Sequence, residues 1–221
     1  MNSLFILLWD ELRGFIKSKV MIALWVGLPL LTIIIHLLRP DTEGIPLSIF
    51  TGLFISSISG LLGAIMLSTT LVSELNARVY DLFLIRPVKR WHIIIAKYIT
   101  VMFCLITAAL LSLGTSLVID HFTVGVPPKT ALLDVLDSLV MSIAAMSIAC
   151  VAGILIGILV KSVALAAILS IYLGQQFSTA AILPSIFLEN IDPLYFSLGL
   201  GVGITAIILT IEIIIFQKKQ F

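Results

Sequence analysis

The chain reads Glu74-Leu-Asn-Ala-Arg-Val-Tyr-Asp-Leu-Phe-Leu-Ile-Arg-Pro-Val-Lys-Arg-Trp-His92 between two segments that are almost entirely apolar. Apolar side chains recur in this stretch with the period of an α-helix, as at Leu75, Val79 and Leu82, while charged side chains lie on another face. Pro87 ends the pattern, because the residue before a proline is disfavoured in the α conformation. We therefore expect a short amphipathic helix over residues 74–86, packed on the membrane surface or docked into a soluble partner.

The composition is that of an integral membrane protein. Hydrophobic residues make up 60% of the 221 residues and charged residues only 11%, against roughly 25% charged residues in soluble domains. A membrane span needs about 20 mostly apolar residues. Six segments meet this requirement, and we expect an all-α membrane protein with one transmembrane domain over residues 1–221. The predicted spans are residues 20–38, 49–72, 93–119, 135–160, 163–183 and 194–216.

The positive charges predict how the chain is oriented in the membrane. Cytoplasmic loops carry an excess of Lys and Arg. An N-terminus inside the cell places all of the 13 Lys and Arg residues on the cytoplasmic side except Arg39 and Lys129. An even number of spans then puts the C-terminus inside as well. The net charge of +1 and the absence of a long basic run give no indication of a nucleic-acid partner.

Two segments outside the spans have their own patterns. Residues 2–18 carry an apolar stripe that includes Phe5 and Leu8, with charged residues on another side, so we expect an amphipathic helix lying flat in the inner membrane interface. Between the fifth and sixth spans, Pro184 and Glu189 interrupt a run of large apolar residues. This pattern predicts a short re-entrant or interfacial segment on the outer side.

Polar and small residues gather in the second and fifth spans. Small residues let membrane helices approach closely, and two consecutive glutamines deep in a span are costly unless they face protein or water. We interpret these residues as a candidate substrate pathway, with ordinary helix packing and interhelical hydrogen bonds as the alternative. The candidates are Ser56, Ser59, Gly60, Gly63, Gly174, Gln175, Gln176 and Ser178.

The fourth and sixth spans carry two further features. Small residues at four-residue spacing form a ridge in the fourth span, which we expect to pack within the subunit. Glu212 is an acid inside the last span, about one turn from its cytoplasmic end. We expect it to pair with Lys97 or Lys161 or to reach the interface, in preference to relaying protons. The ridge consists of Ala145, Ala149, Gly153 and Gly157.

Motifs for catalysis are missing from the sequence. There is no Gly-x-x-x-x-Gly-Lys-Ser/Thr loop, so any ATP hydrolysis must come from another polypeptide. His36, His92 and His121 are scattered and suggest neither a zinc site nor a nucleophile–base pair. Cys104 and Cys150 lie in predicted spans without ligands at metal-binding spacing. We expect no catalytic residue, no metal site and no cofactor on this chain.

With these features the chain resembles the membrane permease subunits of the ABC type-2 exporter class, also called type V ATP-binding cassette exporters. The resemblance covers essentially the whole chain. It rests on the following motifs: Glu11-Leu-Arg13 and Lys17-Ser-Lys19 before the first span, Pro29 within it, Glu74 followed by Leu84-Ile-Arg86-Pro-Val-Lys-Arg90, and Ala96-Lys97 at the start of the third span.

The resemblance implies a function and partners. In that class the helix after the second span is the coupling helix, which inserts into a groove of an ATP-binding subunit, and the second and fifth spans face the axis of a permease dimer. It implies a homodimer or heterodimer of permeases in the inner cell membrane, with ATP and Mg²⁺ on separate ATP-binding subunits, exporting a lipid, drug or peptide. The coupling residues carried over are Glu74, Arg78, Leu82, Phe83, Arg86 and Pro87.

Two other classes of function are alternatives to the exporter. An ion-driven secondary transporter or channel is one, although the chain shows no recognisable internal repeat. An intramembrane enzyme is the other, and it lacks a set of acids, histidine or serine converging at the middle of the membrane.

Overall fold

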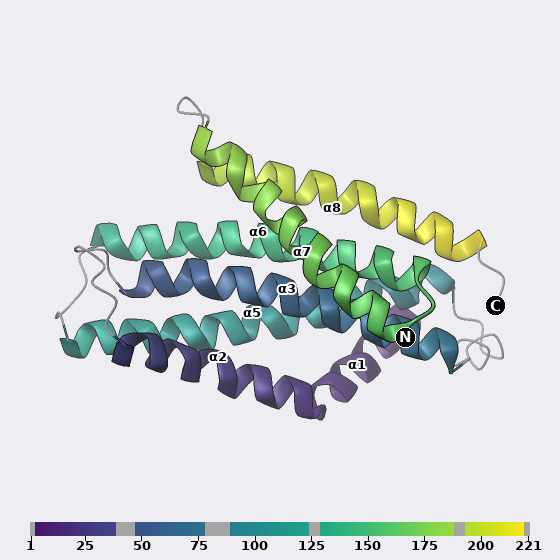
Figure 1. Cartoon of the computed structure of the whole chain (residues 1–221), viewed down its shortest axis with the longest axis horizontal. Coiled ribbons are helices and arrows are strands. Elements are labelled where there is room, and N and C mark those ends of the chain that lie inside the picture. Colours follow the sequence, from purple (N-terminus) through teal and green to yellow (C-terminus); the bar gives the residue numbers. More distant parts are fainter. Residues whose placement is uncertain (1–2, 39–46, 78–88, 124–128, 188–192, 219–221) are drawn as a thin grey trace.

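A computed structural model of the chain describes residues 3–38, 47–77, 89–123, 129–187 and 193–218, and this part is all-helical (Figure 1). Short turns at residues 17–18 and 160–162 join α1 to α2 and α6 to α7. The described helices are α1 (Ser3–Ile16), α2 (Lys19–Leu38), α3 (Leu47–Asn76), α5 (Arg90–Thr123), α6 (Lys129–Leu159), α7 (Val163–Phe187) and α8 (Pro193–Lys218).

Five of these helices contain a stretch long and apolar enough to cross a membrane, in α2, α3, α5, α6 and α8. They coincide with five of the six predicted spans. The remaining predicted span, residues 163–183, lies in α7, where the apolar stretch within the described residues, Val163–Phe177, is shorter than a span. That α7 crosses the membrane therefore stays a prediction.

Several predicted boundaries differ from the structure, and two of them concern the expected coupling and re-entrant segments. The coupling helix was expected from residue 74, but residues 74–76 belong to the last turn of α3, and residues 78–88 lie outside the described part. The fifth span was expected to end before Pro184, but α7 continues through Pro184 to Phe187. No separate helix lies between α7 and α8 among the residues that the structure describes, and residues 188–192 are not among them. The expected re-entrant segment therefore stays a prediction.

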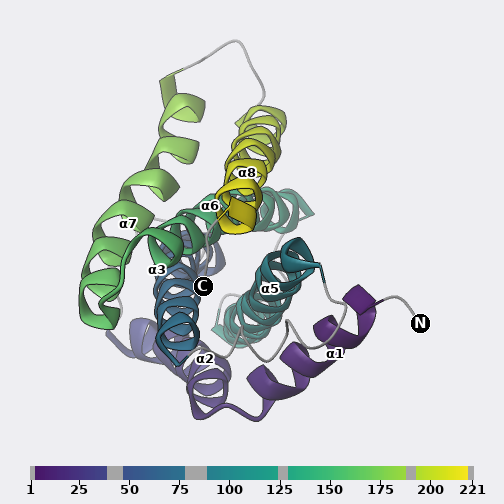
Figure 2. The ribbon, with the colours of Figure 1, turned by 90° about the vertical axis from the view of Figure 1, so that its right-hand side faces the viewer.

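The core lies where α3 packs between α5, α6 and α7. The most extensive helix contact is between α3 and α6, and α6 also packs on α7 and α8. Viewed along the bundle, α1 and α2 lie on one side, while α7 and α8 lie on the other (Figure 2). Most of the apolar stretch of α6 is buried, whereas only a small share of those of α2 and α8 is buried. The helices on the outside are thus apolar and exposed at the same time.

That outer surface fits lipid. In α2 the exposed side chains include Val20, Ile22 and Val26, and in α8 they include Val202 and Ile207. Exposed apolar patches of this extent are rare on soluble proteins, and helices satisfy their backbone hydrogen bonds internally, as a membrane span must. The fold is therefore that of a multi-pass membrane protein.

The bundle has two chemically different ends. At the end that carries α1, which we call the α1 end, α3 and α6 finish, α5 and α7 begin, and the chain approaches its C-terminus (Figure 1). Lys89, Lys161 and Lys218 lie at this end, whereas Lys129, at the start of α6, lies at the opposite end. The predicted orientation, with the α1 end in the cytoplasm, rests on this distribution and stays a prediction.

Hydroxyl groups attach α2 to α5. The Thr32 and Ser112 oxygens are 2.6 Å apart, and each lies 3.1 Å from the carbonyl oxygen of Leu28. Trp25 donates its Nε1–H to the carbonyl of Cys104 at 3.3 Å. These contacts lie beside Pro29, and α2 runs through this proline as one helix.

Candidate functional site

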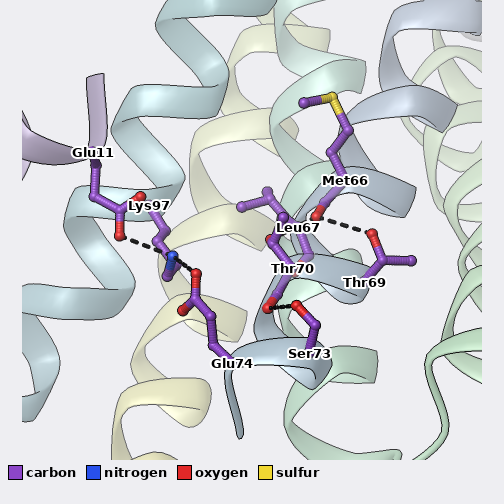
Figure 3. Close-up of polar contacts among 8 residues, drawn as sticks. All are labelled: Glu11, Met66, Leu67, Thr69, Thr70, Ser73, Glu74 and Lys97. Carbon is purple, nitrogen blue, oxygen red and sulfur yellow. Dashed lines mark hydrogen bonds and ion pairs between the residues drawn. The ribbon is translucent and has the colours of Figure 1, made fainter. Parts of the chain in front are cut away.

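Three charged side chains from three helices meet at the α1 end (Figure 3). The Nζ atom of Lys97 in α5 lies 2.8 Å from Oε1 of Glu11 in α1 and 2.6 Å from Oε1 of Glu74 in α3. Lys97 is 3% exposed, and the two carboxylates are 23% and 27% exposed. We call Glu11, Lys97 and Glu74 the ion cluster.

The amphipathic pattern of α1 places Glu11 in the ion cluster. Leu7, Glu11 and Phe15 are spaced four residues apart and therefore lie on one face of the helix. Leu7 and Phe15 are buried in the main core cluster, and α1 packs on α5. The same apolar burial that holds α1 on the bundle thus directs Glu11 toward Lys97.

The end of α3 carries a row of hydroxyl groups that bond within the helix. Thr69 Oγ1 donates to the carbonyl of Ile65 at 2.7 Å, Thr70 Oγ1 donates to the carbonyl of Met66 at 2.6 Å, and Ser73 Oγ donates to the carbonyl of Thr70 at 2.9 Å. Such bonds to the preceding turn satisfy polar side chains on a helix in apolar surroundings. Figure 3 shows this row next to Glu74.

The predicted coupling residues are only partly within the described chain. Glu74 is there, in the last turn of α3, and its carboxylate bonds Lys97. The others, which lie in residues 78–88, are outside the described part, and their role stays a prediction. They are Arg78, Leu82, Phe83, Arg86 and Pro87.

Three predicted pathway residues of α3, Ser59, Gly60 and Gly63, are packed into the bundle. A Cβ atom added at Gly63 would lie 2.6 Å from Sγ of Cys150 in α6. Ser59 is fully buried, and its Oγ has no hydrogen-bond partner within the described chain. Gly60 is also buried, and Ser56 lies in α3 with surroundings that are not described. Close packing of α3 accounts for the small residue at position 63.

One predicted pathway residue of α7, Gly174, lies at the contact of this helix with α3. A Cβ atom added at Gly174 would lie 3.0 Å from Cβ of Ala64. Gln175 is half-buried and Gln176 is exposed, and both make interactions within the structure. Ser178 belongs to α7, with surroundings outside the described part. A pathway along α3 and α7 stays a prediction.

The predicted packing ridge of α6 is confirmed. Ala145 and Ala149 are fully buried, and a Cβ atom at Gly153 would overlap the backbone of Ala64 in α3. A Cβ atom at Gly157 would come within 3.1 Å of the next turn of α3. The ridge lets α3 and α6 pack backbone against backbone.

Glu212 does not behave as the sequence suggested. It is fully buried in α8, so it does not reach the interface, and neither carboxylate oxygen has a hydrogen-bond partner among the described residues. Lys97, one expected partner, is bound in the ion cluster, and Lys161 is exposed without an ion pair to Glu212.

Other polar groups share the interface of α8 with α6 and α5. The hydroxyls of Ser147 in α6 and Thr205 in α8 are 3.1 Å apart, and the Tyr98 hydroxyl of α5 interacts with both. Thr205 and Glu212 are seven residues apart and so face the same way on α8. Ionisable groups inside a membrane bundle often mark an ion pathway or a substrate pathway.

Metal binding has no support in the part of the chain with assigned positions. There, no three His, Cys, Asp or Glu side chains converge in a way that could hold a metal ion. The Glu11 and Glu74 carboxylates converge, but on the ammonium of Lys97.

Fold and site together define an all-helical, multi-pass membrane protein with a buried ion cluster at one end. The chain belongs to the family described as "Protein of unknown function (DUF2705)", whose sequence profile matches residues 43–221. No curated protein matches the chain. The matched region contains Glu74 and Lys97 but not Glu11, so the ion cluster connects it to the preceding helix α1.

Proposed function

We propose that this chain is the membrane permease subunit of an ATP-driven exporter of the ABC type-2 class. Two permeases, identical or similar, pair with separate ATP-binding subunits in the inner cell membrane and move an amphipathic or hydrophobic substrate out of the cytoplasm. The substrate class is a lipid, a drug or a peptide. ATP and Mg²⁺ bind to the partner subunits.

The observation that carries this proposal is the position of the ion cluster. Residues 78–88, which hold the coupling motif, connect the end of α3 to the start of α5. Glu74 and Lys97 flank this connection and bond each other, and Lys97 also holds Glu11 of α1. A buried ion pair keeps its geometry because separating the charges leaves one of them uncompensated. A movement imposed on the connection is therefore passed to α1, α3 and α5 together.

Substitutions in the coupling motif test the proposal. Leu82→Asp or Phe83→Asp should leave the chain folded but remove the ATP-binding subunit and its ATPase activity from the purified complex, because a carboxylate would enter an apolar groove. Phe122→Asp is the matched control, since Phe122 is 83% exposed and lies at the other end of the bundle. Normal ATPase activity in the Leu82 and Phe83 variants would contradict the docking role.

One observation favours a second candidate, an ion-driven transporter. Glu212 is a buried carboxylate inside a span, and such residues commonly belong to ion pathways. Transport into sealed membrane vesicles separates the two candidates. The exporter requires ATP and tolerates an ionophore, whereas the ion-driven transporter works without ATP and stops when the ionophore removes the gradient.

A further inference from the structure

A pocket of about 1010 Å³ lies between α1 and α3 at the α1 end. Glu11 and Glu74 of the ion cluster line it, as does Val20 of α2. Its volume is at the upper end of the range of about 300–1,000 Å³ for small-molecule sites. The pocket can therefore hold a ligand of considerable size.

The α3 wall of this pocket changes from apolar to polar along the helix. Leu62 and Met66 come first, Thr69 and Thr70 follow, and Glu74 is last. At 1.5 Å per residue these positions span about 18 Å, close to the roughly 15 Å thickness of one leaflet of the hydrocarbon core. The wall thus matches an amphiphile with its tail toward the membrane interior and its head at the α1 end.

The α1 wall supplies cations for an acidic head group. Arg13 and Lys17 are four residues apart and both line the pocket. The Arg13 guanidinium also lies 5.2 Å from the centre of the Trp9 ring, which does not line the pocket, in a cation–π contact. Arginine and lysine are the usual partners of phosphate groups in proteins.

Other groups in the pocket accept hydrogen bonds. The hydroxyl hydrogens of Thr69 and Thr70 are used on the carbonyls of Ile65 and Met66, so these oxygens present lone pairs to a ligand. The carboxylates of Asp10 and Glu11 border the same space. Acceptors of this kind suit a primary ammonium group, which has N–H donors, and not a quaternary ammonium, which has none.

We propose that this pocket binds a membrane phospholipid with a primary-amine head group, of the phosphatidylethanolamine class. Its phosphate lies at Arg13 and Lys17, its ammonium at Thr69 and Thr70, and an acyl chain follows the apolar part of α3. The site does not depend on the exporter function, because lipid binding is measured on the isolated chain.

Lipid competition tests the head-group chemistry. The purified full-length chain is equilibrated in detergent micelles with equal amounts of phosphatidylethanolamine, phosphatidylcholine and phosphatidylglycerol, and the lipid retained is counted by native mass spectrometry. We expect phosphatidylethanolamine to exceed each of the others about tenfold, which corresponds to about 1.4 kcal/mol. Equal retention of the three lipids, or a preference for phosphatidylglycerol, would overturn the proposal.

A pair of glycine variants locates the binding site. Gly14 lines the pocket, and a Cβ atom there meets nothing within 4 Å. The backbone therefore accepts a side chain at this position, and Gly14→Leu, which places a branched side chain on the pocket wall, should reduce phosphatidylethanolamine retention about tenfold. Gly27→Leu is the matched control, because Gly27 also has open space around it but lies in α2 outside the pocket. Equal retention by the two variants would place the lipid elsewhere and refute the proposal.

Two further variants separate the head-group contacts. Thr69→Val with Thr70→Val removes the acceptors at nearly constant shape and should abolish the preference for phosphatidylethanolamine over phosphatidylcholine while lipid still binds. Arg13→Gln with Lys17→Gln should lower the binding of all three phospholipids, and Lys19→Gln, outside the pocket, should not. An unchanged lipid preference in the threonine variant would contradict the assignment of the ammonium.

Discussion

Nζ of Lys97 lies 2.6 Å from Oε1 of Glu74, so that the first turns of α5 are tied to the last turn of α3. The two residues are 23 positions apart in the sequence, and the connection between their helices contains the proposed coupling motif. Lys97 is 3% exposed, which makes this contact part of the interior. The Lys97–Glu74 ion pair therefore links the helices on either side of the proposed coupling motif.

Removal of the Lys97 charge should destabilise the fold. Lys97→Met leaves the Glu11 and Glu74 carboxylates facing each other without a cation. Removing one partner of a buried ion pair costs about 3–5 kcal/mol of stability. We expect Lys97→Met to lower the free energy of unfolding by about 3 kcal/mol, because both carboxylates are partly exposed. The measurement is thermal unfolding in detergent, with the exposed Lys161→Met as control. Equal transition temperatures for the two variants would contradict a stabilising ion cluster.

A methyl group at Gly153 should separate α3 from α6. In Gly153→Ala the new Cβ overlaps the backbone of Ala64, which cannot move as a flexible side chain would. We expect a loss of stability of about 1–3 kcal/mol, the usual effect of overpacking a core. Gly114→Ala in α5, where a Cβ meets nothing within 4 Å, should not destabilise the chain. The measurement is thermal unfolding of both variants. A Gly153→Ala variant as stable as the parent chain would refute the close approach of α3 and α6.

The hydroxyl pair between α2 and α5 should contribute modestly. Thr32 and Ser112 are 2.6 Å apart and buried, and interhelical hydrogen bonds in membrane proteins average about 0.6 kcal/mol. A double-mutant cycle with Thr32→Val and Ser112→Ala should give a coupling energy of this size. Strictly additive effects of the two substitutions would show that the pair contributes nothing to stability.

Neutralisation of Glu212 should be tolerated. Burial without a cation favours the neutral form of a carboxyl group, and glutamine is neutral with nearly the same shape, so Glu212→Gln should be about as stable as the parent chain. Asp137→Asn, at an exposed position, is the control. The exporter account also predicts that ATP-dependent transport survives in Glu212→Gln. A folded Glu212→Gln variant without transport would instead support the ion-driven alternative.

Much of the fold could be predicted because apolar length and helical period are local properties of the sequence. Residues 20–38 match α2 (Lys19–Leu38), and residues 194–216 match α8 (Pro193–Lys218). The ends are less predictable, because an apolar window marks the hydrocarbon thickness and not the end of the helix. For this reason α5 extends beyond residues 93–119 at both ends, and α7 passes through Pro184.

The site was less accessible to sequence reasoning, since it depends on contacts between distant residues. Glu11, Glu74 and Lys97 each appear in the motifs of the resemblance, yet nothing in their spacing joins them. The available signal was that Glu11 shares a helix face with Leu7 and Phe15, which indicates that its side chain points toward the bundle. For Glu212, the nearly unbroken run of apolar residues around it does not indicate which side of α8 packs on α6.

The most direct test of the proposed function is to purify the tagged full-length chain from its native membranes in mild detergent and identify the bound proteins by mass spectrometry. Our account predicts a stoichiometric ATP-binding subunit that is retained by the parent chain and by Phe122→Asp but lost from Phe83→Asp. A chain that repeatedly purifies without any ATPase would contradict the assignment as an exporter permease.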